Sequence, residues 1–178
     1  MSARRPGVDG ATPERSFPPD PAREALKRAF GAFPTGVTVV ATAGEAGPVG
    51  FTANSFTSVS LDPPLLLVCH GTHASSHAAF RAAGGFSVNV LAADQGDLAR
   101  RFASRVPDRF EGVRWRSGAG GPLIDGTAAW FDCRTHSMHE AGDHTIMVGR
   151  VVDHGHEERD ALAYWRGQFL SNIAAAIG

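Results

Sequence analysis

The chain has 178 residues, of which 43% are hydrophobic, and a formal net charge of −1 from 17 basic and 18 acidic residues. This length is typical of a single domain with a sizeable core, and the balanced charge excludes a strongly basic nucleic-acid surface. No apolar run reaches membrane-spanning length, and the two cysteines, Cys69 and Cys133, form no CxxC pair. We therefore expect a cytoplasmic globular protein that binds neither nucleic acid nor membrane.

The N-terminal part of the chain divides into a tail and a helix. Residues 1–19 are rich in proline, glycine and charge, so we expect a disordered tail. A helix is predicted next, because Asp20 is a suitable N-cap and Pro21 a favoured first helical residue. Pro34 ends the run. One face of this helix is apolar, with Leu26, Ala29, Phe30 and Phe33 at helical spacing.

Hairpin-like strands dominate the middle of the chain. A Val/Thr strand over 36–43 and the turn-forming segment 44–48 lead into a second strand at Phe51. Asn54-Ser55 is the expected point where this strand bends, because both side chains can bond nearby backbone. The apolar run Leu65–His70 is typical of a strand buried on both faces.

The remaining elements continue this order. We predict a short helix over 72–80, a strand over 86–91, a helix capped by Asp94, an irregular segment over 105–121, two long antiparallel strands over 126–139 and 144–154, and a last strand or short helix over 161–169. Many strands in hairpin order with few helices indicate a mainly β fold, an antiparallel β-barrel with flanking helices. One domain over 20–170 and a C-terminal tail over 171–178 are expected.

A row of short polar side chains runs along the segment Phe51–Pro64. Alternate residues of a strand share a face, so Thr52 lies with Asn54, and Ser58 lies with Ser60. Such a row suits an oxygen-rich ligand in a mostly apolar cleft. An edge strand with a solvated Ser/Thr face is the alternative interpretation.

Four separated motifs carry a resemblance to a known family. They are Phe33–Val40 (FPTGVTVV), Thr52–Cys69 (TANSFTSVSLDPPLLLVC), Phe86–Leu91 (FSVNVL) and Gly142–Thr145 (GDHT). In this order they resemble the short-chain flavin reductases of two-component flavin-dependent monooxygenases, over about Ala25 to Phe169.

The resemblance implies a fold and an activity. The fold is an FMN-binding split barrel, a homodimer with its flavin sites near the subunit interface. The activity is an NAD(P)H:flavin oxidoreductase that reduces FMN or FAD with NADH or NADPH and supplies a partner monooxygenase. A flavin-binding carrier without nicotinamide turnover, and a split-barrel reductase of a corrinoid or ferric chelate, remain alternatives.

The resemblance also implies the site residues. His144 is expected to position the nicotinamide, and Ser75 and Ser76 to contact the flavin phosphate. The full set of implied cofactor-binding residues is Thr35, Gly36, Val37, Thr52, Ala53, Asn54, Ser55, Ser58, Ser60, Ser75, Ser76, Asn89, Arg101, Phe102, Ala103 and His144.

Histidines make one loop unusual. His70, His73 and His77 stand where the family carries apolar and hydroxyl residues, which leaves open whether the flavin is FMN or FAD. The eight histidines have no metal-site spacing, and no HExxH motif occurs, so no metal site is predicted.

Overall fold

The computed structural model describes residues 20–171. The tail predicted for residues 1–19 and nearly all of the tail predicted for 171–178 lie outside this range. The helices are α1 (Pro21–Phe30), α2 (His77–Ala82) and α3 (Gly96–Ala103). The strands are β1 (Thr35–Gly36), β2 (Thr38–Gly44), β3 (Gly47–Ala53), β4 (Thr57–Leu61), β5 (Pro64–Gly71), β6 (Gly85–Val90), β7 (Trp115–Ser117), β8 (Pro122–Ile124), β9 (Ala129–Ala141), β10 (His144–His156), β11 (Ala163–Trp165) and β12 (Gln168–Leu170).

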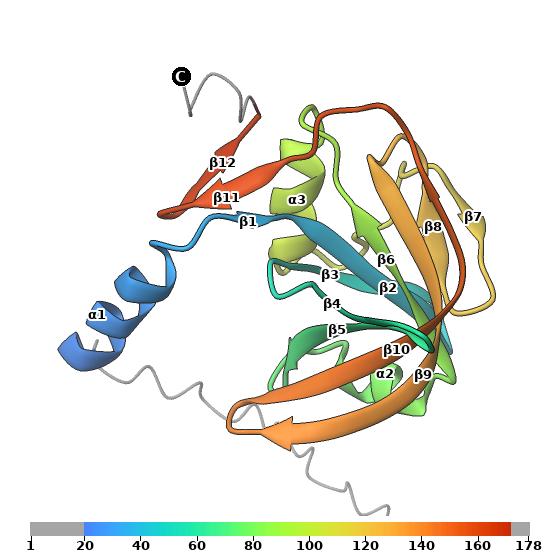
Figure 1. Cartoon of the computed structure of the whole chain (residues 1–178), viewed down its shortest axis with the longest axis horizontal. Helices are drawn as coiled ribbons and strands as arrows, with labels where there is room; N and C mark the ends of the chain where they lie inside the picture. The colour runs from blue at the N-terminus through green and yellow to red at the C-terminus, as the bar shows by residue number, and fades with distance from the viewer. Residues whose placement is uncertain (1–19, 172–178) are drawn as a thin grey trace, which may run out of the picture.

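Seven strands form the main sheet, in the order β3-β2-β6-β9-β10-β5-β4. Each neighbouring pair is antiparallel. The sheet curls into a barrel-like body, with α2 and α3 against it and α1 set apart from it (Figure 1). This confirms the predicted mainly β, antiparallel barrel with flanking helices.

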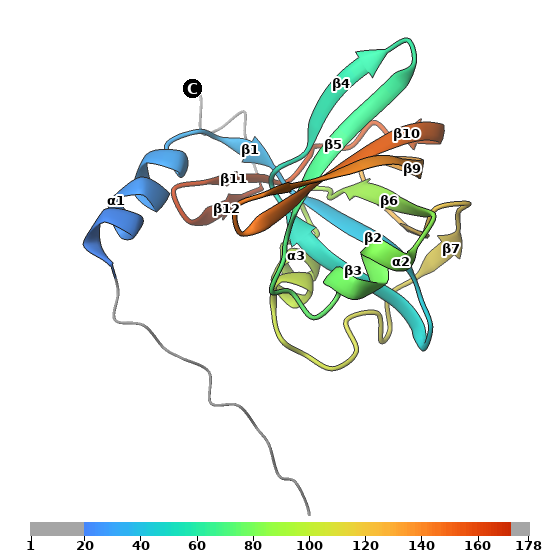
Figure 2. The same ribbon diagram turned by 90° about the horizontal axis from the view of Figure 1, so that it is seen from below.

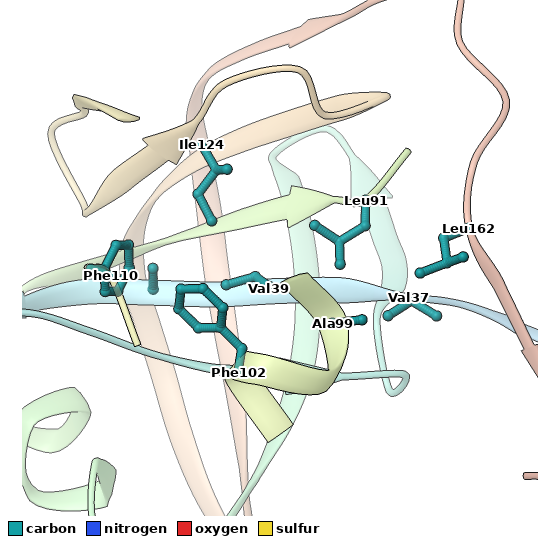
Figure 3. Packing of buried hydrophobic residues seen from close by; sticks show 9 residues of the cluster. Val37, Val39, Leu91, Ala99, Phe102, Phe110, Ile124 and Leu162 are labelled. Carbon is teal, nitrogen blue, oxygen red and sulfur yellow. The ribbon is translucent and has the colours of Figure 1, made fainter. Parts of the chain in front are cut away.

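Two apolar clusters fill the body. The first gathers side chains from β2, α3 and the chain around β8, including Val39, Phe102 and Ile124 (Figure 3). The second cluster lies between β2, β5, β6 and α2, and it includes Val68 and Phe80. Because α3 contributes to the first cluster and α2 to the second, both helices are held firmly on the barrel.

The helix α1 begins as predicted, but its apolar face is exposed. The Asp20 carboxylate accepts a hydrogen bond from the Ala22 amide at 3.0 Å, which confirms the N-cap. The helix ends at Phe30, before the predicted boundary at Pro34, and buries no residue. Phe30 and Phe33 are 71% and 74% exposed.

The hairpin of β4 and β5 projects from the barrel (Figure 2). The break before β4 lies at 54–56, which confirms the predicted bend. The prediction that β5 is buried on both faces is wrong. Leu66, Val68 and His70 are buried, whereas Leu65 and Leu67 are partly exposed. The second face is therefore only partly covered.

Three further boundaries differ from prediction. The helix α2 begins at His77, five residues after the predicted Thr72, because the chain first makes turns between Gly71 and His77. Asp94 does not cap α3, since its carboxylate bonds Arg159 at 2.7 Å. The segment 161–169 contains two short strands, β11 and the start of β12, rather than one element.

Within residues 20–171, no helix is both long and apolar enough to cross a membrane. The same residues contain no group of three or more histidine, cysteine or acidic side chains placed to hold a metal ion.

Candidate functional site

A cleft of about 840 Å³ opens between β3, the loop before α2 and the chain that follows α3. This volume lies in the range of small-molecule and cofactor sites, roughly 300–1,000 Å³. The cleft is lined by Pro48, Val49, Gly50, Phe51, Thr52, His73, Ala74, Ser75, Ser76, Phe102, Ala103, Arg105, Val106, Pro107, Asp108, Arg109 and Phe110. Three segments far apart in sequence therefore meet at one concave surface.

Five of the predicted cofactor-binding residues line this cleft: Thr52, Ser75, Ser76, Phe102 and Ala103. The Thr52 hydroxyl already donates to the Ala99 carbonyl at 2.7 Å, so it ties β3 to α3. Phe102 is 1% exposed and forms part of the wall. Ser75 and Ala103 are exposed at the surface of the cleft.

Beneath the cleft lies His70, which is 1% exposed. Its ring stacks on Phe51, with centroids 4.0 Å apart and an interplanar angle of 9°. Its Nε2 atom lies 3.1 Å from the Ser76 hydroxyl oxygen. The pKa of His70 is lowered from 6.5 to about 4, chiefly by burial and in addition by the charges of His77, His144 and Arg109. We call Phe51, His70, Ser76 and Phe80 the cleft floor.

Arg109 belongs to the cleft although the sequence did not single it out. Its Nε and Nη2 atoms donate to the Ser104 carbonyl at 2.9 and 2.6 Å, and its Nη1 donates to the Gly50 carbonyl at 2.9 Å. A guanidinium has five donor hydrogens, so two remain for a ligand. The sequence predicted only an irregular, charged segment over 105–121, and no motif in that segment indicated a role for this arginine.

The first predicted loop lies outside the cleft. Val37 is 1% exposed and belongs to the first core cluster. Thr35 has a buried hydroxyl without a hydrogen-bond partner among residues 20–171. Gly36 is exposed, and a Cβ added there would meet no atom within 4 Å.

The predicted polar row divides in the structure. Ala53 is buried and Asn54 is exposed in the bend. The Ser55 hydroxyl accepts from the Cys69 amide at 2.9 Å, which ties the bend to β5. Ser58 and Ser60 lie on β4, on the projecting hairpin. None of these residues lines the cleft of the single chain.

Two further predicted residues, Asn89 and Arg101, also lie outside the cleft. Asn89 is fully buried, and its side chain donates to the Val39 and Pro122 carbonyls and accepts from the Ile124 amide. Its predicted flavin contact stays a prediction, as do the other assignments. Arg101 lines a neighbouring depression that shares residues 106–108 with the cleft.

His144 is exposed at the start of β10, directly after the turn. Its Nδ1 atom lies 2.7 Å from the Asp143 carboxylate, and this hydrogen bond, with the charge of His144, holds the pKa of Asp143 below its ordinary value. Arg23 of α1 approaches the same carboxylate at 3.8 Å. If Nδ1 carries the proton that it donates to Asp143, Nε2 is left as a hydrogen-bond acceptor.

The cleft fits a flavin nucleotide in size and in chemistry. Such a ligand needs an apolar slot for its ring system and donors for its phosphate and sugar oxygens. Phe51 supplies apolar surface, and the buried rings of Phe102 and Phe110 lie behind the cleft wall. Ser76 and Arg109 supply donors, and the guanidinium also supplies positive charge for a phosphate.

The chain is similar to known proteins along most of its length. Residues 30–172 match the family model described as a flavin reductase like domain. A probable flavin reductase of Rhizobium meliloti is 50% identical over 149 residues, which are 83% of this chain and 48% of that protein. The chain thus spans about half the length of that relative.

Two other matches extend over most of both chains. The reductase subunit of a flavin-dependent monooxygenase from Rhodococcus jostii is 42% identical over 164 residues, 90% of this chain and 82% of that protein. The solved structure of an NADH:FAD oxidoreductase from Streptomyces globisporus C-1027, in complex with NAD and FAD fragments, superposes with a TM-score of 0.82 at 45% identity. That match covers 88% of this chain and 97% of the other.

Proposed function

The chain belongs to the flavin reductase-like family, and from this premise we propose that it is an NAD(P)H-dependent flavin reductase that passes hydride from the nicotinamide to FMN or FAD. The observation that carries the proposal is the cleft between β3, α2 and α3. It unites five of the residues that the family resemblance implied for flavin binding. The similarity to an NADH:FAD oxidoreductase supports the same assignment.

The chain contributes binding and positioning. Phe51 presents apolar surface that displaces water from a bound ring, while Arg109 and Ser76 provide donors toward phosphate oxygens. The bound flavin supplies the ring nitrogen that accepts the hydride. Hydride transfer requires close stacking of two rings, at roughly 3–3.5 Å, more than it requires an acid or a base.

We propose that His144 serves the nicotinamide. The Asp143 carboxylate holds the Nδ1 side of its ring at 2.7 Å. With the proton on Nδ1, Nε2 can accept a hydrogen bond from a carboxamide NH₂ group. His144 is then a positioning group, and hydride transfer asks for no proton from it.

We also propose that the protein acts as a homodimer. The exposed apolar side chains of α1 and of the β4–β5 hairpin support this, because Leu26, Phe30, Val59 and Leu61 are 53%, 71%, 50% and 95% exposed in the single chain. Surfaces of this kind mark association sites. A second copy of the chain would cover them and would bring further groups to Asn54 and Ser58. We call α1 together with β4 the open edge.

A flavin-dependent monooxygenase is the proposed recipient of the reduced flavin. The similarity to a monooxygenase reductase subunit supports this. A cytoplasmic location is part of the same proposal, since the reaction consumes NAD(P)H.

Anaerobic reduction tests the proposed activity. Purified protein, NADH or NADPH, and FMN or FAD are mixed without oxygen, and bleaching of the flavin absorbance band is followed. We expect catalytic bleaching with at least one nicotinamide. An unchanged spectrum with all four combinations would contradict the reductase assignment and favour a flavin-binding carrier.

A cleft-filling pair locates the activity. Ala103 is exposed in the cleft, so Ala103→Trp should occupy it and abolish bleaching. Ala82 is also exposed but lies at the end of α2, outside the cleft lining, so Ala82→Trp should leave the rate unchanged. Equal activity of the two variants would place the reaction elsewhere.

A further inference from the structure

His70 touches the cleft only through other residues. It does not line the cleft, but Phe51 and Ser76, which do, both contact it. The edge of Phe80 closes the ring on another side, at 4.9 Å between centroids. The imidazole is therefore enclosed, and Ser76 is its hydrogen-bonding partner.

The two ring nitrogens of His70 differ in their surroundings. Nε2 faces the Ser76 hydroxyl at 3.1 Å, whereas Nδ1 is buried without any hydrogen-bond partner among residues 20–171. A buried N–H without an acceptor is costly and rare, and an unpaired lone pair is less so. The proton of the neutral ring therefore belongs on Nε2.

The ring is held in its neutral form by its neighbours. His77 lies 5.4 Å away between ring centroids and is tied to Thr145 at 2.9 Å. The charges of His77, His144 and Arg109 all disfavour a positive charge on the His70 ring, and burial disfavours it more strongly. A single proton on Nε2 then defines the direction of the hydrogen bond to Ser76.

That direction determines what the Ser76 hydroxyl can do. When Nε2–H donates to the Ser76 oxygen, the hydroxyl hydrogen is directed to another acceptor. Among residues 20–171 the Ser76 side chain makes no other hydrogen bond, and Ser76 lines the cleft next to Ser75. An acceptor for the Ser76 hydroxyl hydrogen would therefore have to be a ligand in the cleft.

We propose that His70 is a positioning residue that holds the Ser76 hydroxyl as a hydrogen-bond donor toward a phosphate oxygen of the nucleotide in the cleft. The assignment rests on the proposed flavin function. It makes His70 a determinant of the affinity for the phosphate group. Arg109, on the opposite segment of the cleft lining, supplies charge for the same group.

The first test compares FMN with riboflavin, which has the same ring and ribityl chain but no phosphate. Kd is measured by fluorescence titration for the wild type, His70→Phe, His70→Gln, His70→Asn and Ser76→Ala. Phe keeps an aromatic ring against Phe51 without a donor. Gln places an amide NH₂ near the position of Nε2, and Asn places one near Nδ1.

We expect His70→Phe and Ser76→Ala to weaken FMN binding by about tenfold, the effect of one hydrogen bond to a charged group, and to change riboflavin binding less than about twofold. His70→Gln should restore most of the FMN affinity, and His70→Asn should not. An unchanged ratio of FMN to riboflavin affinity in His70→Phe overturns the proposal for His70. A wild type that binds neither flavin overturns the proposed function itself.

A second measurement uses the unaltered protein, so it decides even if a variant fails to fold. Nitrogen NMR of ¹⁵N-labelled histidine distinguishes the two neutral tautomers. The proton of His70 on Nε2 supports the proposal, and the proton on Nδ1 overturns it because Ser76 would then donate to the ring.

Discussion

The cleft floor and the open edge are built from similar residue types but reach opposite states. In the floor, His70 and Phe80 are each 1% exposed, and the one hydroxyl there, on Ser76, has a defined partner. On the open edge, Phe30 is 71% exposed and Leu61 is 95% exposed. The floor is buried within one chain, whereas the open edge is not.

The predicted site residues divide along the same line. Ser75 and Ser76 lie with the floor, and Asn54 and Ser58 lie near the open edge. This division indicates that part of the proposed flavin site is complete in one chain. The rest depends on what covers α1 and β4. Four experiments test this difference between the cleft floor and the open edge.

The largest expected effect on stability comes from removing one aromatic ring, either from the cleft floor or from the open edge. Phe80→Ala should lower the free energy of unfolding by about 3–5 kcal/mol, because the cavity lies in a packed core. Phe30→Ala removes an exposed ring, so its effect should come only from a lost contact with a second copy. Urea unfolding at two protein concentrations checks this.

We expect the loss in Phe80→Ala to be the same at both concentrations and the loss in Phe30→Ala to shrink on dilution. A loss in Phe30→Ala that is large and independent of concentration would contradict the distinction.

The second effect is a dependence of stability on pH that originates in the floor. His70 has a pKa of about 4 in the fold against 6.5 as its ordinary value, so the unfolded chain binds the proton more readily. Stability is therefore full above pH 6.5 and falls as the pH drops toward 4, by about 3 kcal/mol in total.

His70→Gln has no titrating group at this position, so its melting temperature should fall less steeply over the same range. Thermal melts from pH 7 to pH 4 compare the two proteins. Parallel curves would show that His70 does not carry the acid sensitivity.

The third effect belongs to the open edge. Leu61→Glu places a charge on a side chain that is 95% exposed in one chain, so the fold should survive. In the proposed dimer the charge would be buried. The dissociation constant of the dimer should therefore rise about a hundredfold, because burying an unpaired charge is costly. Light scattering over a dilution series measures it, with Ala46→Glu in the exposed β2–β3 turn as the control. A Leu61→Glu dimer as tight as the control would exclude this surface from the interface.

The smallest effect concerns His144, whose side chain is 50% exposed. His144→Ala should leave the flavin Kd unchanged and lower kcat/KM for the nicotinamide about tenfold, the contribution of one hydrogen bond. His139→Ala provides a match, because His139 is also exposed and lies on the paired strand. Steady-state kinetics with saturating flavin decides, and equal kcat/KM values in the two variants would remove His144 from the nicotinamide site.

Local chemistry made much of the fold predictable. The Asp20 cap and the long β9–β10 hairpin follow from interactions between residues close in sequence, whereas the bend at 54–56 is tied to β5 by the Ser55 hydroxyl. Gly142 has a φ of 64°, a conformation that glycine adopts without strain, and it marks the hairpin turn in the sequence itself. The family resemblance likewise implied Thr52, Ser75 and Ser76, which line the cleft.

The sequence alone determined that this is a mainly β, antiparallel domain with flavin-reductase motifs, since strand alternation, caps and turns are properties of neighbouring residues. Only the tertiary structure decided which polar groups meet. Arg109 reaches Gly50 across 59 positions, and His77 reaches Thr145 across 68. The burial of His70 depends on Phe51 and Phe80 from other elements. Burial and long-range hydrogen bonds are properties of the packed chain, and for that reason no local pattern could place Arg109 in the cleft lining or His70 beneath it.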